Sequence, residues 1–171
     1  KVTNSYDPLP AGEYLVVLNK AEHFVSKRSG WEAMSFDFQV IDGEYAGRHE
    51  RDMVSLAQKS TKGNDIPDFV VARNIRTIAK VAALSDVDLE DSDFEGTETD
   101  VYEKLCERFE GKEGATMVMK ITETKNKKDP DNPYRNYDFD EEDKSESEPA
   151  SNDLPKDTTE VDEIEEDKLP F

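Results

Sequence analysis

The chain has 171 residues and a formal net charge of −19 at pH 7, but the charge is distributed unevenly. Residues 138–171 hold 15 acidic residues and three lysines, whereas residues 1–85 and 114–137 together hold 14 acidic and 16 basic residues. The acidic total therefore does not exclude nucleic acid as a ligand. One cysteine, Cys106, excludes an intramolecular disulfide, and no stretch is apolar enough to cross a bilayer, so we expect a cytoplasmic protein.

Three strands are predicted in the first third of the chain. Residues 13–25 are rich in β-branched and aromatic side chains, and Lys27-Arg28-Ser29-Gly30 then interrupts the pattern as a turn does. In residues 31–41 apolar side chains recur at every second position, which predicts a strand with one buried face. Asp42-Gly43 begins the next turn, and residues 48–56 form the third predicted strand.

Two helices and two further strands are predicted after residue 65. Apolar residues recur at helical spacing in 66–84 and again in 101–109. Residues 115–124 return to a strand pattern, 125–133 form a basic, turn-rich loop, and 134–139 are predicted to be a short last strand.

The predicted fold is therefore mainly β with a helical insertion between the third and fourth strands. This element order is that of the OB-fold, a five-stranded Greek-key barrel. We expect an OB-like domain over residues 1–137. The acidic insertion 86–113 has no counterpart in such a barrel, and we expect it either to cover one barrel end or to make an oligomer contact.

Barrels of this type bind oligonucleotides on their second and third strands, assisted by the loops between strands one and two and between strands four and five. Both of these loops are basic here. A single strand needs cations for its phosphates and aromatic faces for its bases. The candidate cations are Lys27, Arg28, Arg48, Arg51, Lys59, Lys62, Lys125, Lys127, Lys128 and Arg135. The candidate stacking residues are Trp31, Tyr45, Tyr134 and Tyr137. Packing within the fold is the competing interpretation of each aromatic residue, and we favour it for Phe36 and Phe38.

Residues 138–171 consist mainly of Asp, Glu, Ser, Pro and Lys, and this composition predicts a disordered acidic tail. The tail ends in a short apolar plug whose last residue would also carry the terminal carboxylate. Such an end suits a pocket with a basic rim on another protein. The candidate partner-binding residues are Asp167, Leu169, Pro170 and Phe171.

This tip resembles that of bacterial and bacteriophage single-stranded-DNA-binding proteins, in which an acidic tail ends in Pro-Phe. The body is also similar to a bacteriophage family of conserved proteins of unknown function. The similarity rests on Pro10-Ala11-Gly12-Glu13-Tyr14 and on Asp42-Gly43-Glu44-Tyr45-Ala46-Gly47-Arg48. This similarity of the body implies a phage replication or recombination setting and supports the OB-like fold. Together with the tip, it leads us to expect a protein of the host cytoplasm that binds single-stranded DNA in phage DNA replication, recombination or repair and recruits enzymes of those processes through its tip.

The sequence gives little support for a catalytic function. His23 and His49 have neither metal-ligand spacing nor a position near Cys106, and there is no phosphate-binding glycine loop or nucleophile elbow. We therefore expect neither catalysis nor a cofactor. Two alternatives are an acidic DNA mimic that inhibits a host nuclease or restriction factor, and a β-barrel adaptor that binds only proteins. Homo-oligomerisation is left open.

Overall fold

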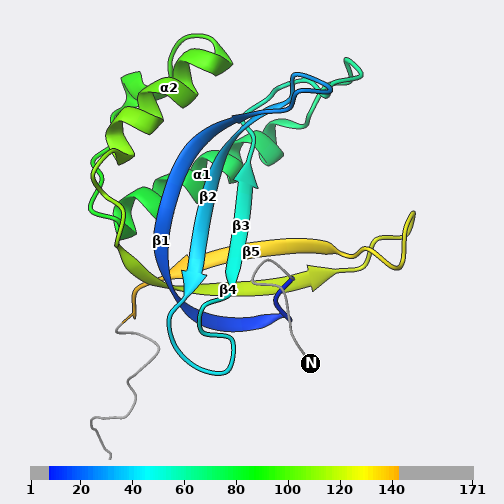
Figure 1. The fold of residues 1–171 in the computed structure, drawn as a ribbon. Helices are drawn as coiled ribbons and strands as arrows, with labels where there is room; N and C mark the ends of the chain where they lie inside the picture. Colours follow the sequence, from blue (N-terminus) through cyan, green and yellow to red (C-terminus); the bar gives the residue numbers. More distant parts are fainter. Residues whose placement is uncertain (1–7, 143–171) are drawn as a thin grey trace, which may run out of the picture. The chain divides into compact units, whose positions relative to one another are not determined.

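Five strands form one antiparallel sheet in the order β3-β2-β1-β4-β5 (Figure 1). This is a computed structural model, and it describes residues 8–142. The strands are β1 (Gly12–Val25), β2 (Glu32–Val40), β3 (His49–Val54), β4 (Thr116–Thr124) and β5 (Tyr134–Asp140). The prediction of a mainly β domain with helices between the third and fourth strands is confirmed at this level.

Strand β1 connects the two halves of the sheet. Its first half, Gly12–Val17, pairs with β4, and the segment from Val16 to Val25 pairs with β2. The register shifts between Leu18 and Lys20, which marks an irregularity of the β-bulge kind. Because a bulge bends and twists a strand, β1 can curve from one half of the sheet into the other, as Figure 1 shows.

The helical insertion contains α1 (Asp68–Leu84), the short 3-10 helix η1 (Asp91–Phe94) and α2 (Glu98–Phe109). Thr97 begins α2 with a capping box, because its side chain accepts a hydrogen bond from the backbone N of Asp100 at 3.1 Å and the Asp100 carboxylate accepts one from the backbone N of Thr97 at 3.2 Å. Within residues 8–142, no helix is long and apolar enough to cross a membrane.

Helix α2 packs its apolar face against β1 and β2. Its buried residues are Val101, Tyr102, Leu105 and Phe109, and the ring of Phe109 lies 5.3 Å from that of Phe36. This part of the acidic insertion therefore packs on the β1–β2 half of the sheet.

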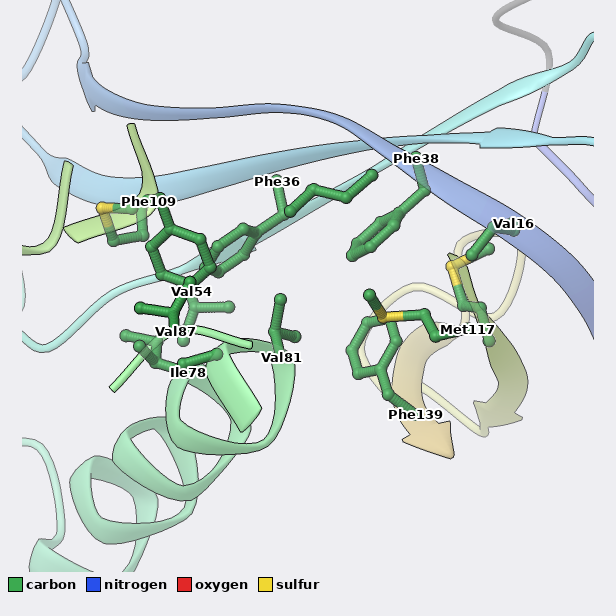
Figure 2. Close-up of a cluster of buried hydrophobic side chains, with 14 of the residues drawn as sticks. Val16, Phe36, Phe38, Val54, Ile78, Val81, Val87, Phe109, Met117 and Phe139 are labelled. Atoms are coloured by element: carbon green, nitrogen blue, oxygen red, sulfur yellow. The ribbon is translucent and has the colours of Figure 1, made fainter. Parts of the chain in front are cut away.

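The core lies between the sheet and the helices (Figure 2). Phe36 and Phe38 are fully buried, as expected from their alternation along β2. In Figure 2, Ile78 and Val81 of α1 point into the same core cluster as Phe36 and Phe38. The helix thus uses its apolar side for the core and leaves its polar side outward.

The sheet extends beyond the domain boundary expected at residue 137. Strand β5 continues to Asp140, and Phe139 is only 2% exposed. Its ring lies 5.0 Å from that of Phe38. The charges of Asp138 and Asp140 make this segment look like tail in composition, but packing of Phe139 places it in the body.

Candidate nucleic-acid interface

The turn between β1 and β2 presents two of the expected cations. The Ser26 hydroxyl accepts hydrogen bonds from the backbone N atoms of Arg28 and Ser29, each at 3.3 Å. Gly30 has a φ of +76°, a conformation that favours glycine. The turn is therefore shaped by its own backbone and Ser26, and the side chains of Lys27 and Arg28 are exposed.

The loop between β4 and β5 is organised by Asn126. Its side-chain oxygen accepts a hydrogen bond from the backbone N of Lys128 at 3.1 Å, and its amide donates to the carbonyl of Asn132 at 3.0 Å. Tyr134, which begins β5, is 56% exposed. The exposed lysines of this loop are Lys125, Lys127 and Lys128. The loop therefore combines exposed cations with an accessible aromatic ring.

Trp31 and Tyr45 lie at opposite ends of β2, so the structure does not bring these two candidates together. Trp31 is half-buried and packs against Phe24 with 6.0 Å between ring centroids. Tyr45 packs edge-on against Tyr14, also at 6.0 Å, and the guanidinium of Arg48 lies 5.4 Å from the Tyr45 ring centroid. Tyr45 and Arg48 thus pack on one another beside Tyr14, away from the β1–β2 turn.

The other expected cations of the first half lie on β3 and in the segment that follows it. Arg51 is exposed on β3. Lys59 forms an ion pair with Asp65 at 2.6 Å, whereas Lys62 is exposed on the same loop. The positive charge of Lys59 is therefore partly compensated.

Arg135 and Tyr137 join the two edge strands of the sheet. Arg135 Nη2 lies 2.7 Å from Glu50 Oε2 on β3, and the Tyr137 hydroxyl donates a hydrogen bond to the same carboxylate. Arg135 also contacts Glu123 at 3.1 Å and the carbonyl of Leu9 at 2.9 Å. Burial and the hydrogen bond to Glu50 raise the pKa of Tyr137 above its ordinary value. The polar atoms of both candidates are thus engaged within the fold.

A groove of about 550 Å³ opens between α1, β3 and β5. Trp31 lines it beside three cations of α1, Arg73, Arg76 and Lys80. Sequence reasoning missed these three cations because it used the helix only for its apolar face. The available signal was their spacing of three and four residues, which places side chains on one side of a helix.

Asp52 also lines this groove and is only 7% exposed. Burial, and secondly the negative charge of Glu50, raise its pKa to about 7. Its carboxyl is therefore largely protonated in mildly acidic solution and ionised in mildly basic solution.

The histidines have partners within the fold. His23 Nε2 lies 2.7 Å from Glu32 Oε1, and His49 Nδ1 lies 3.1 Å from Asp37 Oδ2. Across the part of the chain that the structure describes, no group of three or more His, Cys, Asp or Glu side chains is placed to bind a metal ion.

The expected partner-binding residues, Asp167, Leu169, Pro170 and Phe171, lie outside the described residues. No curated protein matches the chain in sequence. The model of a family described as a protein of unknown function, DUF669, matches residues 1–150. Since the match covers most of the 171 residues, the chain belongs to the DUF669 family.

Proposed function

We propose that this protein binds single-stranded DNA through an OB-type domain and serves phage DNA replication, recombination or repair without being an enzyme. The observation that carries the proposal is the strand order β3-β2-β1-β4-β5 with α1 before β4. An OB-fold is a partly open, five-stranded Greek-key barrel, and this strand order with helices before β4 supports that assignment. The ion pair between Glu50 and Arg135 supports the same interpretation, because it connects β3 and β5, the two edges that such a barrel brings together.

The positions of the basic loops agree with this function. OB-folds use the β1–β2 and β4–β5 loops to hold oligonucleotides. In Figure 1 both loops project toward the right-hand side of the view. Together they carry five exposed cations, Lys27, Arg28, Lys125, Lys127 and Lys128. These cations would contact phosphates, and Tyr134 would stack on a base.

The acidic character of the chain is compatible with binding to a polyanion. Twelve acidic residues lie in the insertion 86–113, and 15 lie in residues 138–171. The β1–β2 turn and the β4–β5 loop belong to neither segment. The local potential at the loops, rather than the total charge, governs encounter with phosphates.

A salt-titrated binding assay tests the proposal. Full-length protein is titrated with fluorescent oligo-dT and with duplex DNA of the same length at several salt concentrations. We expect preference for the single strand and a log–log slope of about −0.7 for each phosphate contacted. An acidic DNA mimic or a protein-only adaptor would bind neither DNA, and that outcome would overturn the proposal.

A further inference from the structure

We propose that the polar side of α1 forms a second wall of the DNA path, where Arg73, Arg76 and Lys80 bind phosphates of a single strand and Trp31 stacks on one of its bases. The site is the groove between α1, β3 and β5. This inference rests on the proposed function and extends it from the two loops to the helix.

Arg73 and Arg76 supply charge that the fold does not use. Both side chains are exposed, and within residues 8–142 neither guanidinium takes part in an ion pair. A spacing of three residues places them on the same side of the helix. Lys80 extends this side by one further turn and shares its charge with Asp138 at 3.0 Å. A planar guanidinium binds a phosphate through two N–H donors, so arginine is well suited to this contact.

Arg73 and Arg76 supply most of the uncompensated charge of the groove, because its other charged groups are paired or only partly ionised. Arg135 is paired with Glu50, and Asp138 is paired with Lys80. The Asp52 carboxyl has a pKa of about 7, because it is buried and lies near Glu50, so its negative charge is only partly developed in neutral solution. The groove therefore presents a net positive charge within a chain whose total is −19.

The walls of the groove are fixed by packing. Ile78, Val81 and Ala82 are buried on the opposite side of α1. The Asn74 side chain donates a hydrogen bond to the carbonyl of Ser55 at 2.8 Å and so joins α1 to the end of β3. A binding site on rigid elements loses little conformational entropy when a ligand binds.

Trp31 supplies the aromatic face that a base requires. It lies at the β1–β2 end of the groove and is positioned by Phe24. Stacking of a base on an aromatic side chain contributes about 1–3 kcal/mol by alanine substitution and does not depend on sequence. Trp31 is also the only tryptophan of the chain, so its fluorescence reports directly on occupation of the groove.

The test compares three variants of the full chain. Arg73→Ala/Arg76→Ala removes two groove cations, and Lys20→Ala/Lys112→Ala removes the same charge from β1 and from the turn after α2. Lys125→Ala/Lys127→Ala/Lys128→Ala removes the cations of the β4–β5 loop. Oligo-dT affinity and its salt dependence are measured for each, together with quenching of Trp31 fluorescence and thermal melting.

We expect Arg73→Ala/Arg76→Ala to weaken binding at least tenfold at low salt and to reduce the magnitude of the salt slope by roughly 1.4, the value for two phosphate contacts. Its melting should match that of the wild type. The Lys20→Ala/Lys112→Ala control should bind as the wild type does, and DNA should quench Trp31 in the wild type and in the loop variant.

Distinct outcomes separate the two proposals. If the wild type does not bind oligo-dT, the proposed function fails and the inference fails with it. If the wild type binds oligo-dT and the loop variant binds it more weakly, the proposed function stands. If, in addition, Arg73→Ala/Arg76→Ala binds oligo-dT as the wild type does and DNA does not quench Trp31 fluorescence, only the inference is overturned.

Discussion

The contacts of Arg135 identify it as a residue that stabilises the body. Its guanidinium faces Glu50, which is only 8% exposed. We expect Arg135→Ala to lower the free energy of unfolding by about 2–4 kcal/mol, because a buried carboxylate would lose its charge partner. Urea unfolding measures this change. Arg51→Ala, an exposed change on the same strand as Glu50, should stay within about 0.5 kcal/mol. Equal stability of the two variants would show that Arg135 is not structural.

Asp52 makes stability depend on pH in an unusual direction. Its pKa rises from 3.8 to about 7 on folding, so the folded state binds more protons than the unfolded state between these values. The contribution of Asp52 to the stability of the folded state therefore becomes less favourable as pH rises from about 4 to 7, and it keeps this less favourable value above pH 7. We expect Asp52→Asn to raise the free energy of unfolding by about 2–4 kcal/mol at pH 8, with little gain at pH 4. Urea unfolding at both pH values measures the difference, and a pH-independent difference would contradict the assignment.

Single residues differ in how far the sequence predicts their roles. The period-two pattern of β2 is enough to place Phe36 and Phe38 in the core, and both are fully buried. The same local reasoning cannot find the partner of Arg135, because Glu50 lies 85 residues away in the chain. A cation bound to a buried carboxylate and a cation open to DNA look alike in sequence. Only the tertiary contact separates them.

At the scale of elements, the β4–β5 loop offers a direct test of the phosphate contacts. We expect Lys125→Ala/Lys127→Ala/Lys128→Ala to reduce the magnitude of the salt slope for oligo-dT by roughly 2, since each lysine would lose about one phosphate contact worth 0.7. The fold should be unchanged, because Asn126 organises this loop through the backbone N of Lys128 and the carbonyl of Asn132. A slope and affinity equal to those of the wild type would remove the loop from the DNA path.

The sequence predicts the boundaries of strands and helices closely where apolar residues recur regularly. Strand β1 was expected over 13–25 and spans Gly12–Val25, and α1 was expected over 66–84 and spans Asp68–Leu84. Periodicity also predicts α2, but not the surface that it covers. Strand β5 was expected over 134–139 and spans Tyr134–Asp140, and its buried Phe139 lies beyond the domain boundary that composition placed at residue 137.

At the scale of the whole molecule, residues 143–171 carry 11 acidic residues and three lysines. Because they belong to the same chain as the basic groove, they would compete with DNA at a raised effective concentration. We expect deletion of 143–171 to tighten oligo-dT binding, most strongly at low salt where screening is weak. Starting the deletion after residue 142 keeps β5 and Phe139 intact. Unchanged affinity at low salt would show that the acidic segment does not compete.

The last three residues should act separately from this charge effect. Deleting Leu169, Pro170 and Phe171 removes no charged side chain, so oligo-dT affinity should stay close to that of the wild type. The same deletion should abolish capture of purified host repair or recombination enzymes that bind acidic tips ending in Pro-Phe. Phe171→Ala should lose most of that capture. Recovery of the same enzymes with and without the tip would refute recruitment.

The position of β1 between β2 and β4 has a consequence for how the chain folds. Its contacts with β2 are local, whereas its pairing with β4 places Gly12 opposite Ile121. Forming that second pairing requires closure of a long loop that includes the whole helical insertion, and such non-local contacts slow folding. We therefore expect the hairpin of β1 and β2 to form early in folding and β4 and β5 to join it late. A nascent chain would leave one edge of β1 unpaired until β4 has been synthesised, and during that interval it would be most exposed to aggregation.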